Sequence, residues 1–538
     1  MTMTETRPEA GAAALPAASG STALVPESPG LAGWVLTSDH KRVGRLYIGF
    51  SLLFLLGALV IGALLGWERV DASDTQLLDD GAIAQFVSLH TLGLAFLGTT
   101  PLLLGLAIAV VPLQVGARSI AFPRAAAASF WLWLVGSLVF IGAIAADGGP
   151  GGGDPDSVEL FLLAFGVLVL GLLLGSICVG TTVLTLRAPG MDLERVPFFA
   201  WGSLVGGVAL LLTLPALIAD LVLLYADNRY QAGFYGGSQG VSGYLAWTTR
   251  QPQVYAYALP ALGLLADVVP VFARSRQRMV PVLLSAIGLG GFVALGAWAQ
   301  SIYDLDLVEG IPYVAISLLA IVPVLLVLGV SGQTLAKGNL RMAAPLVGAL
   351  TAGLVLLAGA AAGGVGSIPA LETYGTAWDD GQFLLVVLGG AVAGVAGLVY
   401  WGPKLWGRLV PDGSAKGLLT LLALGALLAG LPLLVAGLLD QPAAAVNFVE
   451  EDASGALNAL SAAGLSLMAL LVLGAALLLL RAFSSGSRAG DDPWEGHTLE
   501  WATTSPPSPV NFPEPIPLVT SDRPLLDRRA AADGEVAR

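Results

Sequence analysis

Residues 158–186 read VELFLLAFGVLVLGLLLGSICVGTTVLTL, with Glu159 as the only charged residue of the stretch. The apolar core of a bilayer needs a helix of about 20 mostly apolar residues. Because a spanning segment must satisfy its own backbone hydrogen bonds, a run rich in Leu, Gly and Val predicts a transmembrane helix. Eleven further runs of this kind follow or precede it. The twelve predicted spans lie near 46–67, 85–113, 126–146, 158–186, 198–226, 253–273, 279–303, 310–332, 343–366, 381–402, 417–439 and 457–480.

The composition of the whole chain agrees with this pattern. Of its 538 residues, 56% are hydrophobic and 12% are charged, and the mean hydropathy is +0.79. A soluble domain has about 25% charged residues. The net charge of −13 gives no basic surface for nucleic acid, and one cysteine, Cys178, excludes a disulfide framework or a cysteine-ligated cluster. We therefore predict an all-α, polytopic membrane protein with twelve transmembrane helices.

Basic residues fall almost entirely on one side of the predicted topology. Alternate loops and both terminal tails on that side hold 22 of the 25 Lys and Arg residues, and the other side has only Arg69, Arg229 and Arg250. Lys and Arg accumulate in cytoplasmic loops. We therefore expect both termini in the cytoplasm of a cell whose plasma membrane, bacterial or archaeal, holds the protein.

Three regions differ in composition. Residues 1–32 are rich in Ala, Pro, Ser and Gly and predict a disordered cytosolic tail. Residues 33–488 form the predicted membrane domain. Residues 489–538 are rich in proline, carry Trp494 and Trp501, and predict an extended cytosolic tail.

Five stretches in and beside the loops carry more specific information about the family than hydropathy does. They are TSDHKRVGRLY (37–47), VPLQVGARSIAFPRAAAASFWLWLVGS (111–137), LRAPGMDLERVPFFAW (186–201), YWGPKLWGR (400–408) and DPWEGHTLEWATTSPPSPVNF (492–512). Together they resemble subunit I of the heme–copper terminal oxidases of the cytochrome c oxidase type, over roughly residues 33–515. The order of the stretches and the twelve-span layout are similar as well.

The resemblance implies a defined chemistry. Subunit I of this family holds a low-spin heme and a heme–copper centre on six histidines, reduces O₂ to water and pumps protons, together with subunits II and III. In this chain His90, in SLHTLGLAFL, occupies the position of one low-spin heme ligand. The partner position is Leu384, which has no lone pair, and the high-spin heme ligand position is Gln382.

The other positions that the resemblance assigns to the chemistry are also changed. The three copper positions are Gln251, Gln300 and Ser301, which are weak copper ligands. The proton-relay glutamate position is Gln253, whereas Tyr255 keeps the position of the cross-linked tyrosine. Leu433 and Leu434 replace the arginine pair that holds the heme propionates. Ser119 and Val327 occupy the two proton-input positions.

These changes predict a degenerate, non-catalytic subunit that binds no cofactor, neither heme nor copper; His90 is the one residue at which a residual heme could bind. It would act as a scaffold or partner subunit beside subunit II- and III-like chains or a catalytic subunit I, in contact with membrane lipid and without nucleic acid. A working terminal oxidase subunit is the first alternative. A transporter or proton path with Asp220 at its centre is the second, and Asp267 is expected to snorkel to the inner surface.

The lost ligands also predict a change in packing. We expect the helices around Leu384, Leu433 and Gln300 to close inward, or lipid to fill the site, because unfilled space forfeits dispersion contacts. The alternative is a polar cavity around Gln251, Gln300 and Gln382.

Overall fold

The computed structural model describes residues 30–70, 78–150, 152–235, 258–296, 311–446 and 454–536. Within these ranges the chain is helical, and its only β-type pairings are two isolated bridges, Thr376 with Pro442 and Arg408 with Arg488. The chain divides into a unit of residues 1–37, in which the short helix α1 (Ala32–Val35) is described, and a unit of residues 38–538 that holds all the other elements.

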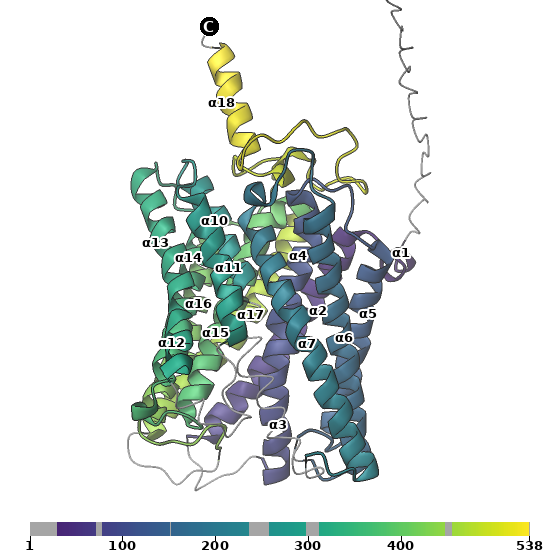
Figure 1. Ribbon diagram of the computed structural model, residues 1–538, viewed down its shortest axis with the longest axis vertical. Coiled ribbons are helices and arrows are strands. Elements are labelled where there is room, and N and C mark those ends of the chain that lie inside the picture. Colours follow the sequence, from purple (N-terminus) through teal and green to yellow (C-terminus); the bar gives the residue numbers. More distant parts are fainter. Residues whose placement is uncertain are drawn as a thin grey trace, which may run out of the picture. The chain divides into compact units, whose positions relative to one another are not determined.

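The first half of the large unit holds long apolar helices that correspond to the predicted spans (Figure 1). Its elements are α2 (His40–Glu68), α3 (Asp80–Leu92), the π-helix η1 (Gly93–Thr99), α4 (Thr100–Gln114), α5 (Pro123–Ala145), α6 (Pro155–Thr185), the 3-10 turn η2 (Leu193–Arg195), α7 (Phe198–Tyr230) and α10 (Leu259–Phe272).

The second half continues the bundle and ends in a tail. Its elements are α11 (Val280–Gly296), α12 (Ile311–Leu319), α13 (Ile321–Lys337), α14 (Ala344–Gly366), the 3-10 turn η4 (Pro369–Leu371), α15 (Ala377–Trp406), α16 (Asp412–Gly437), α17 (Ser454–Ser485), the 3-10 turn η5 (Leu499–Ala502) and α18 (Pro524–Val536).

The predicted membrane architecture is confirmed. Ten helical segments in the described residues are long and apolar enough to cross a membrane. Two shorter apolar helices, α10 and α11, lie where the remaining two spans are predicted, and both expected spans extend into residues that the structure does not describe. The protein is therefore an integral membrane protein of the predicted all-α class.

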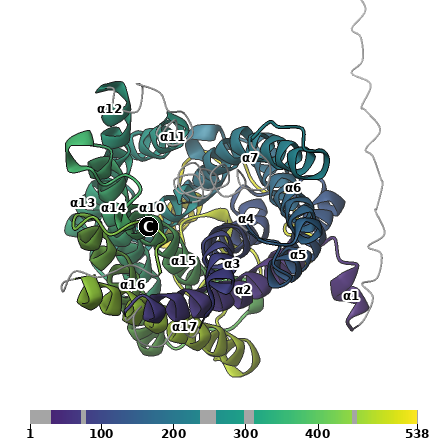
Figure 2. The same ribbon diagram turned by 90° about the horizontal axis from the view of Figure 1, so that it is seen from below.

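Two spans form the interior of the bundle. The most apolar windows of Gly81–Gln114 and of α15 are fully buried, whereas those of the other long spans are 33–61% buried (Figure 2). Small residues let these helices approach closely. A Cβ atom on Gly394 of α15 would lie 2.6 Å from Leu102 Cδ2 of α4, and one on Gly389 would lie 3.0 Å from Leu356 Cδ2 of α14.

Several helices begin at a side-chain cap that the sequence supplies. Asp39, Asp79 and Asp154 precede α2, α3 and α6, and each carboxylate accepts a hydrogen bond from a backbone N–H in the first turn. Thr376 caps α15 in the same way. Such caps satisfy one of the backbone donors that a helix start leaves unpaired.

The prediction of an extended C-terminal tail is wrong in part. It packs against one end of the bundle, with Trp494, Trp501 and Arg523 buried, and then forms α18 (Figure 1). We call the end covered by residues 489–527 the tail-covered end. Trp494 Nε1 donates a hydrogen bond to Tyr400 O of α15 (2.9 Å), which ties the tail to the central span.

Candidate cofactor site at His90

His90 lies in the last turn of α3, against α2. Its Nδ1 atom donates a hydrogen bond to the carbonyl oxygen of Ala58 (2.8 Å). Gly62, one turn further along α2, makes room for the ring, because a Cβ atom there would lie 2.2 Å from His90 Cε1. With Nδ1 carrying the proton, the lone pair of the neutral ring is on Nε2, the nitrogen left for a metal or another donor.

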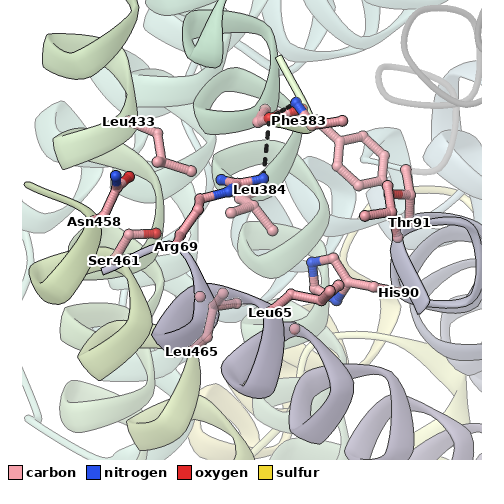
Figure 3. A pocket seen from close by; sticks show the side chains of 15 residues that line it. Leu65, Arg69, His90, Thr91, Phe383, Leu384, Leu433, Asn458, Ser461 and Leu465 are labelled. Carbon is pink, nitrogen blue, oxygen red and sulfur yellow. Dashed lines mark hydrogen bonds and ion pairs between the residues drawn. The ribbon is translucent and has the colours of Figure 1, made fainter. Parts of the chain in front are cut away.

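A cavity opens beside this ring, lined by residues of α2, α3, α15, α16 and α17 (Figure 3). His90 and Leu384 both line it, and so does Leu433, so the structure brings together the two residues that the resemblance places on either side of a low-spin heme. Leu384 and Leu433 border only a narrow space, which agrees with the predicted inward closure, although a small cavity remains between the helices. Gln300 lies outside the described residues. The remaining lining residues are Gly62, Leu65, Gly66, Arg69, Val87, Thr91, Asp380, Phe383, Ala444, Asn458, Ser461 and Leu465.

The polar groups around the cavity were not predicted as site residues. Arg69 at the end of α2 forms an ion pair with Asp380 of α15 (3.7 Å), and Asp380 also accepts from the backbone N–H of Ala444 (2.7 Å). The one signal in the sequence was that Arg69 is among three basic residues on the side predicted to be poor in them. Arg69 gives the cavity a cation that could meet an anionic group of a ligand.

Gln382 does not share this cavity. It is two residues from Leu384 on α15, and positions two apart point to nearly opposite sides of a helix. Gln382 lines a second cavity with Tyr313 and Trp378, and its Nε2 atom is buried without a hydrogen-bond partner in the part of the chain that the structure describes. The structure thus separates the positions that the resemblance assigns to the two hemes.

The other predicted site residues are distributed as follows. Gln251, Gln253, Tyr255, Gln300 and Ser301 lie outside the described residues, so the predicted polar cavity between the glutamines is described only at Gln382. Across residues 30–70, 78–150, 152–235, 258–296, 311–446 and 454–536, His, Cys, Asp and Glu form no group of three that could hold a metal ion.

Asp220 and Asp267, two of the acids within predicted spans, differ in their environment. Asp220 of α7 accepts a hydrogen bond from the hydroxyl of Tyr235 (3.2 Å). Asp267 of α10 was expected to reach toward the membrane surface, and this expectation is wrong. It is buried at the tail-covered end, where it forms an ion pair with Arg523 (3.3 Å). The expectation failed because the compensating cation comes from the tail, 256 residues further along the chain.

These features define a class: a polytopic helical membrane protein with an interior cavity beside a single imidazole. The model of the family described as cytochrome c and quinol oxidase polypeptide I matches residues 42–489, and the chain belongs to that family. The resemblance found in the loop stretches is thereby confirmed.

Individual relatives agree with the family. A putative cytochrome c oxidase subunit 1-beta of Streptomyces avermitilis is 29% identical over 93% of this chain and 93% of its own. The cytochrome c oxidase subunit 1 of Bacillus subtilis is 28% identical over 93% of this chain and 83% of its own. A chain of a heme–copper terminal oxidase dimer solved by cryo-electron microscopy has the same fold, with a TM-score of 0.69 at 16% identity, over 92% of this chain and 90% of that one.

The expectation that the chain binds no cofactor is corrected by this membership. The family and its relatives are oxidases named for cytochrome c, quinol, heme and copper, and substituted positions in the sequence do not outweigh that finding. The residues at the cavity fit a heme held by one axial imidazole in their donor chemistry, since Ala58 O orients His90 and leaves Nε2 available. The leucines of the cavity would have to shift to admit the macrocycle, because they border a narrow space.

Proposed function

We propose that this chain is a subunit I-like component of a respiratory complex that acts as a scaffold or partner subunit and does not itself reduce O₂. The observation that carries the proposal is the pairing of His90 with Leu384 across one cavity, with Gln382 on the other side of α15. Leucine offers no lone pair and an amide is a poor ligand for heme iron, so the histidine pairs on which the family's electron transfer depends are incomplete at the described positions.

We further propose that the cavity holds one heme, bound through Nε2 of His90. A bound heme would supply one-electron transfer. The residues of this chain would position it: Ala58 O fixes the ring of His90, Gly62 admits that ring, and Arg69 is the cation nearest to receive a propionate. Leu384 lines the same cavity and has no donor atom to offer to such a group.

Titration of the purified protein with hemin tests the site. The wild-type chain should give a saturable Soret shift, and His90→Gly should lose it and regain it when imidazole is added. The matched control is His497→Gln, which changes a histidine of the tail and should bind heme as the wild type does. Equal heme binding by His90→Gly and the wild type, without imidazole, would contradict the heme site.

Oxygen consumption tests the partner role separately. The complex isolated with this chain should contain other oxidase subunits, and the chain freed from them should not consume O₂ with reduced cytochrome c or quinol as donor. Steady O₂ consumption by the chain without a second subunit I would establish the alternative, a working oxidase. The heme site can hold or fail independently of this outcome.

We also propose that the tail-covered end faces the cytoplasm. Basic residues of two loops and of the last turn of α15 contact the tail there: Arg195 donates to Val519 O, Arg276 pairs with Asp522, and Lys404 donates to Thr503 O. Cysteines introduced at the exposed positions 372 and 528 should react with an impermeant reagent from opposite sides of the membrane. Reaction of both from one side would exclude this topology.

A further inference from the structure

Three segments that are distant in the sequence bring two carboxyl groups together at the tail-covered end. Gln114 is the last residue of α4, Asp267 lies on α10, and Glu500 lies in the tail turn η5. Nε2 of Gln114 lies 3.2 Å from Oδ2 of Asp267 and 3.3 Å from Oε1 of Glu500. All three side chains are buried, with exposed fractions of 0–2%. The amide nitrogen therefore bridges two carboxyl groups that are shielded from solvent.

Asp267 is surrounded by groups that stabilise its negative charge. Its two oxygens accept hydrogen bonds from the backbone N–H groups of Phe198 (3.1 Å) and Phe199 (2.9 Å), at the N-terminus of α7. Arg523 Nη1 adds an ion pair at 3.3 Å. A helix N-terminus and a guanidinium both favour an anion. Asp267 therefore has the partners that a carboxylate needs in a buried site, with Arg523 as its counter-ion.

Glu500 has a different environment. Oε1 accepts from the neutral donors Gln114 Nε2 and Trp401 Nε1 (3.2 Å). Oε2 is buried and makes no hydrogen bond of good geometry in the described part of the chain, although the Thr498 side chain and the backbone N–H of Glu500 lie beside the carboxyl group. An ionised Glu500 would place a second negative charge beside Asp267 in a buried site, which is strongly unfavourable.

We propose that Glu500 is a proton-binding site that forms when the C-terminal tail docks on the bundle. In the docked tail Glu500 carries a proton on its carboxyl group, and in the free tail, at neutral pH, it has released this proton to water. Docking of residues 489–527 is thereby coupled to the uptake of one proton. This inference does not depend on whether His90 holds a heme.

The charged groups around Glu500 support this assignment. Burial, followed by the charge of Asp267, raises the pKa of Glu500 from 4.5 to about 7. Lys404 of α15 is the nearest amine on the central span, but its Nζ donates to the carbonyl oxygens of Asp491 and Thr503. Tyr400 of α15 also faces the site. The tail also holds the titratable groups His497 and Asp492 at this end: the charges of Arg523 and Arg529 act on His497, and Arg529 forms an ion pair with Asp492.

The coupling has a definite sign. An acid whose pKa is higher in the docked state stabilises docking at pH values below the pKa that it has in the free tail. This stabilisation is lost as the pH rises to the pKa of the docked state. We compare the wild type with a chain that cannot ionise at position 500. The ratio of their opening constants for the tail should rise about tenfold per pH unit between pH 4.5 and about 7, and it should stay constant at higher pH.

Amide hydrogen exchange of residues 489–527 in Glu500→Gln and the wild type, from pH 5 to 8.5, measures this quantity. Glutamine keeps the shape and the Oε1 acceptor. The ratio of wild-type to variant opening constants should rise with pH to about 7 and then level, on the order of 100-fold in total. His497 and Asp492 affect both proteins alike and cancel from the ratio. The matched control is Glu514→Gln, an exposed glutamate of the same tail, whose ratio to the wild type should stay flat.

An infrared spectrum reads the carboxyl group itself rather than the opening of the tail. At pH 6 the wild type should show the C=O stretch of a protonated buried carboxyl, shifted in heavy water and absent in Glu500→Gln. A flat opening ratio across the pH range, or the same carboxyl band in the wild type and Glu500→Gln, would overturn the proposal.

Discussion

Nζ of Lys41, in the first turn of α2, lies 3.1 Å from Oδ1 of Asn511 in the tail, 470 residues further along the chain. Asn511 also donates from Nδ2 to the carbonyl oxygen of Ala117 (2.9 Å), and His40 Nε2 lies 3.0 Å from its Oδ1. One amide thus joins the tail to the start of α2 and to the segment after α4. This contact holds the tail against the start of the first span.

Asn511→Ala should loosen the tail. It removes a buried acceptor from Lys41 and a donor from Ala117 O, and leaving buried polar groups unpaired costs about 1–3 kcal/mol. We expect a loss of stability of about 2 kcal/mol and faster exchange of the tail amides, measured by denaturant unfolding and hydrogen exchange. The control is Asn339→Ala, an exposed asparagine, which should change the stability by less than about 0.5 kcal/mol.

Arg523→Met should destabilise the protein by about 3–5 kcal/mol, because it leaves the charge of buried Asp267 without its counter-ion. Thermal unfolding in detergent or nanodiscs measures the effect. Adding Asp267→Asn should recover part of the loss, since the double variant no longer buries an unpaired charge. Arg528→Met, an exposed arginine of the same tail, serves as the control. Equal losses in the single and the double variant would contradict the pairing.

His497 should make tail docking weaker in acid. Burial, followed by the charges of Arg523, Arg529 and Arg276, lowers the pKa of His497 from 6.5 to about 3. The docked histidine stays neutral while the free tail binds a proton, so docking is favoured above 6.5 and weakens as the pH falls toward 3. His497→Gln should remove this dependence in amide exchange between pH 4 and 7. An unchanged acid dependence in His497→Gln would assign it to another group.

Gly62→Ala should disturb the candidate cofactor site through the ring of His90. The added Cβ would lie 2.2 Å from His90 Cε1, so the ring must move and lose its hydrogen bond to Ala58. We expect about 1–3 kcal/mol of destabilisation and a weaker hemin Soret titration. Gly57→Ala on the same helix is the control, since nothing lies within 4 Å of its added Cβ. Equal hemin affinity in both variants would show that the ring position is not required.

The membrane architecture could be predicted because each span is a local pattern. Runs of apolar residues gave the ten long spans, and the loop stretches gave the family. The pairing of His90 with Leu384 in one cavity was predictable only through that resemblance, since the two residues lie on different spans. No periodicity in the sequence links α3 to α15.

The tail contacts could not be predicted from the sequence. The pairs Arg523–Asp267 and Asn511–Lys41 join residues 256 and 470 positions apart, and hydropathy carries no information on such contacts. One local signal in the sequence does predict part of the tail structure. Pro524 followed by LLDRRAAA has a proline at the first helical position and good helix formers behind it, which predicts the helix α18.

The π-helix η1 lies between α3 and α4 in one membrane span, and its wider turns change the direction in which the side chains of α3 point relative to those of α4. Trp133 Nε1 donates to the carbonyl of Phe96 within this segment (3.0 Å), and Thr99 Oγ1 donates to Val387 O of α15 (3.2 Å). Before the segment, His90 faces α2. One residue of an α-helix turns the chain by about 100°, so a single deletion between Gly93 and Thr99 would regularise the helix and swing His90 away from Ala58. The orientation of the imidazole is thus encoded in the number of residues in the span as well as in their identity.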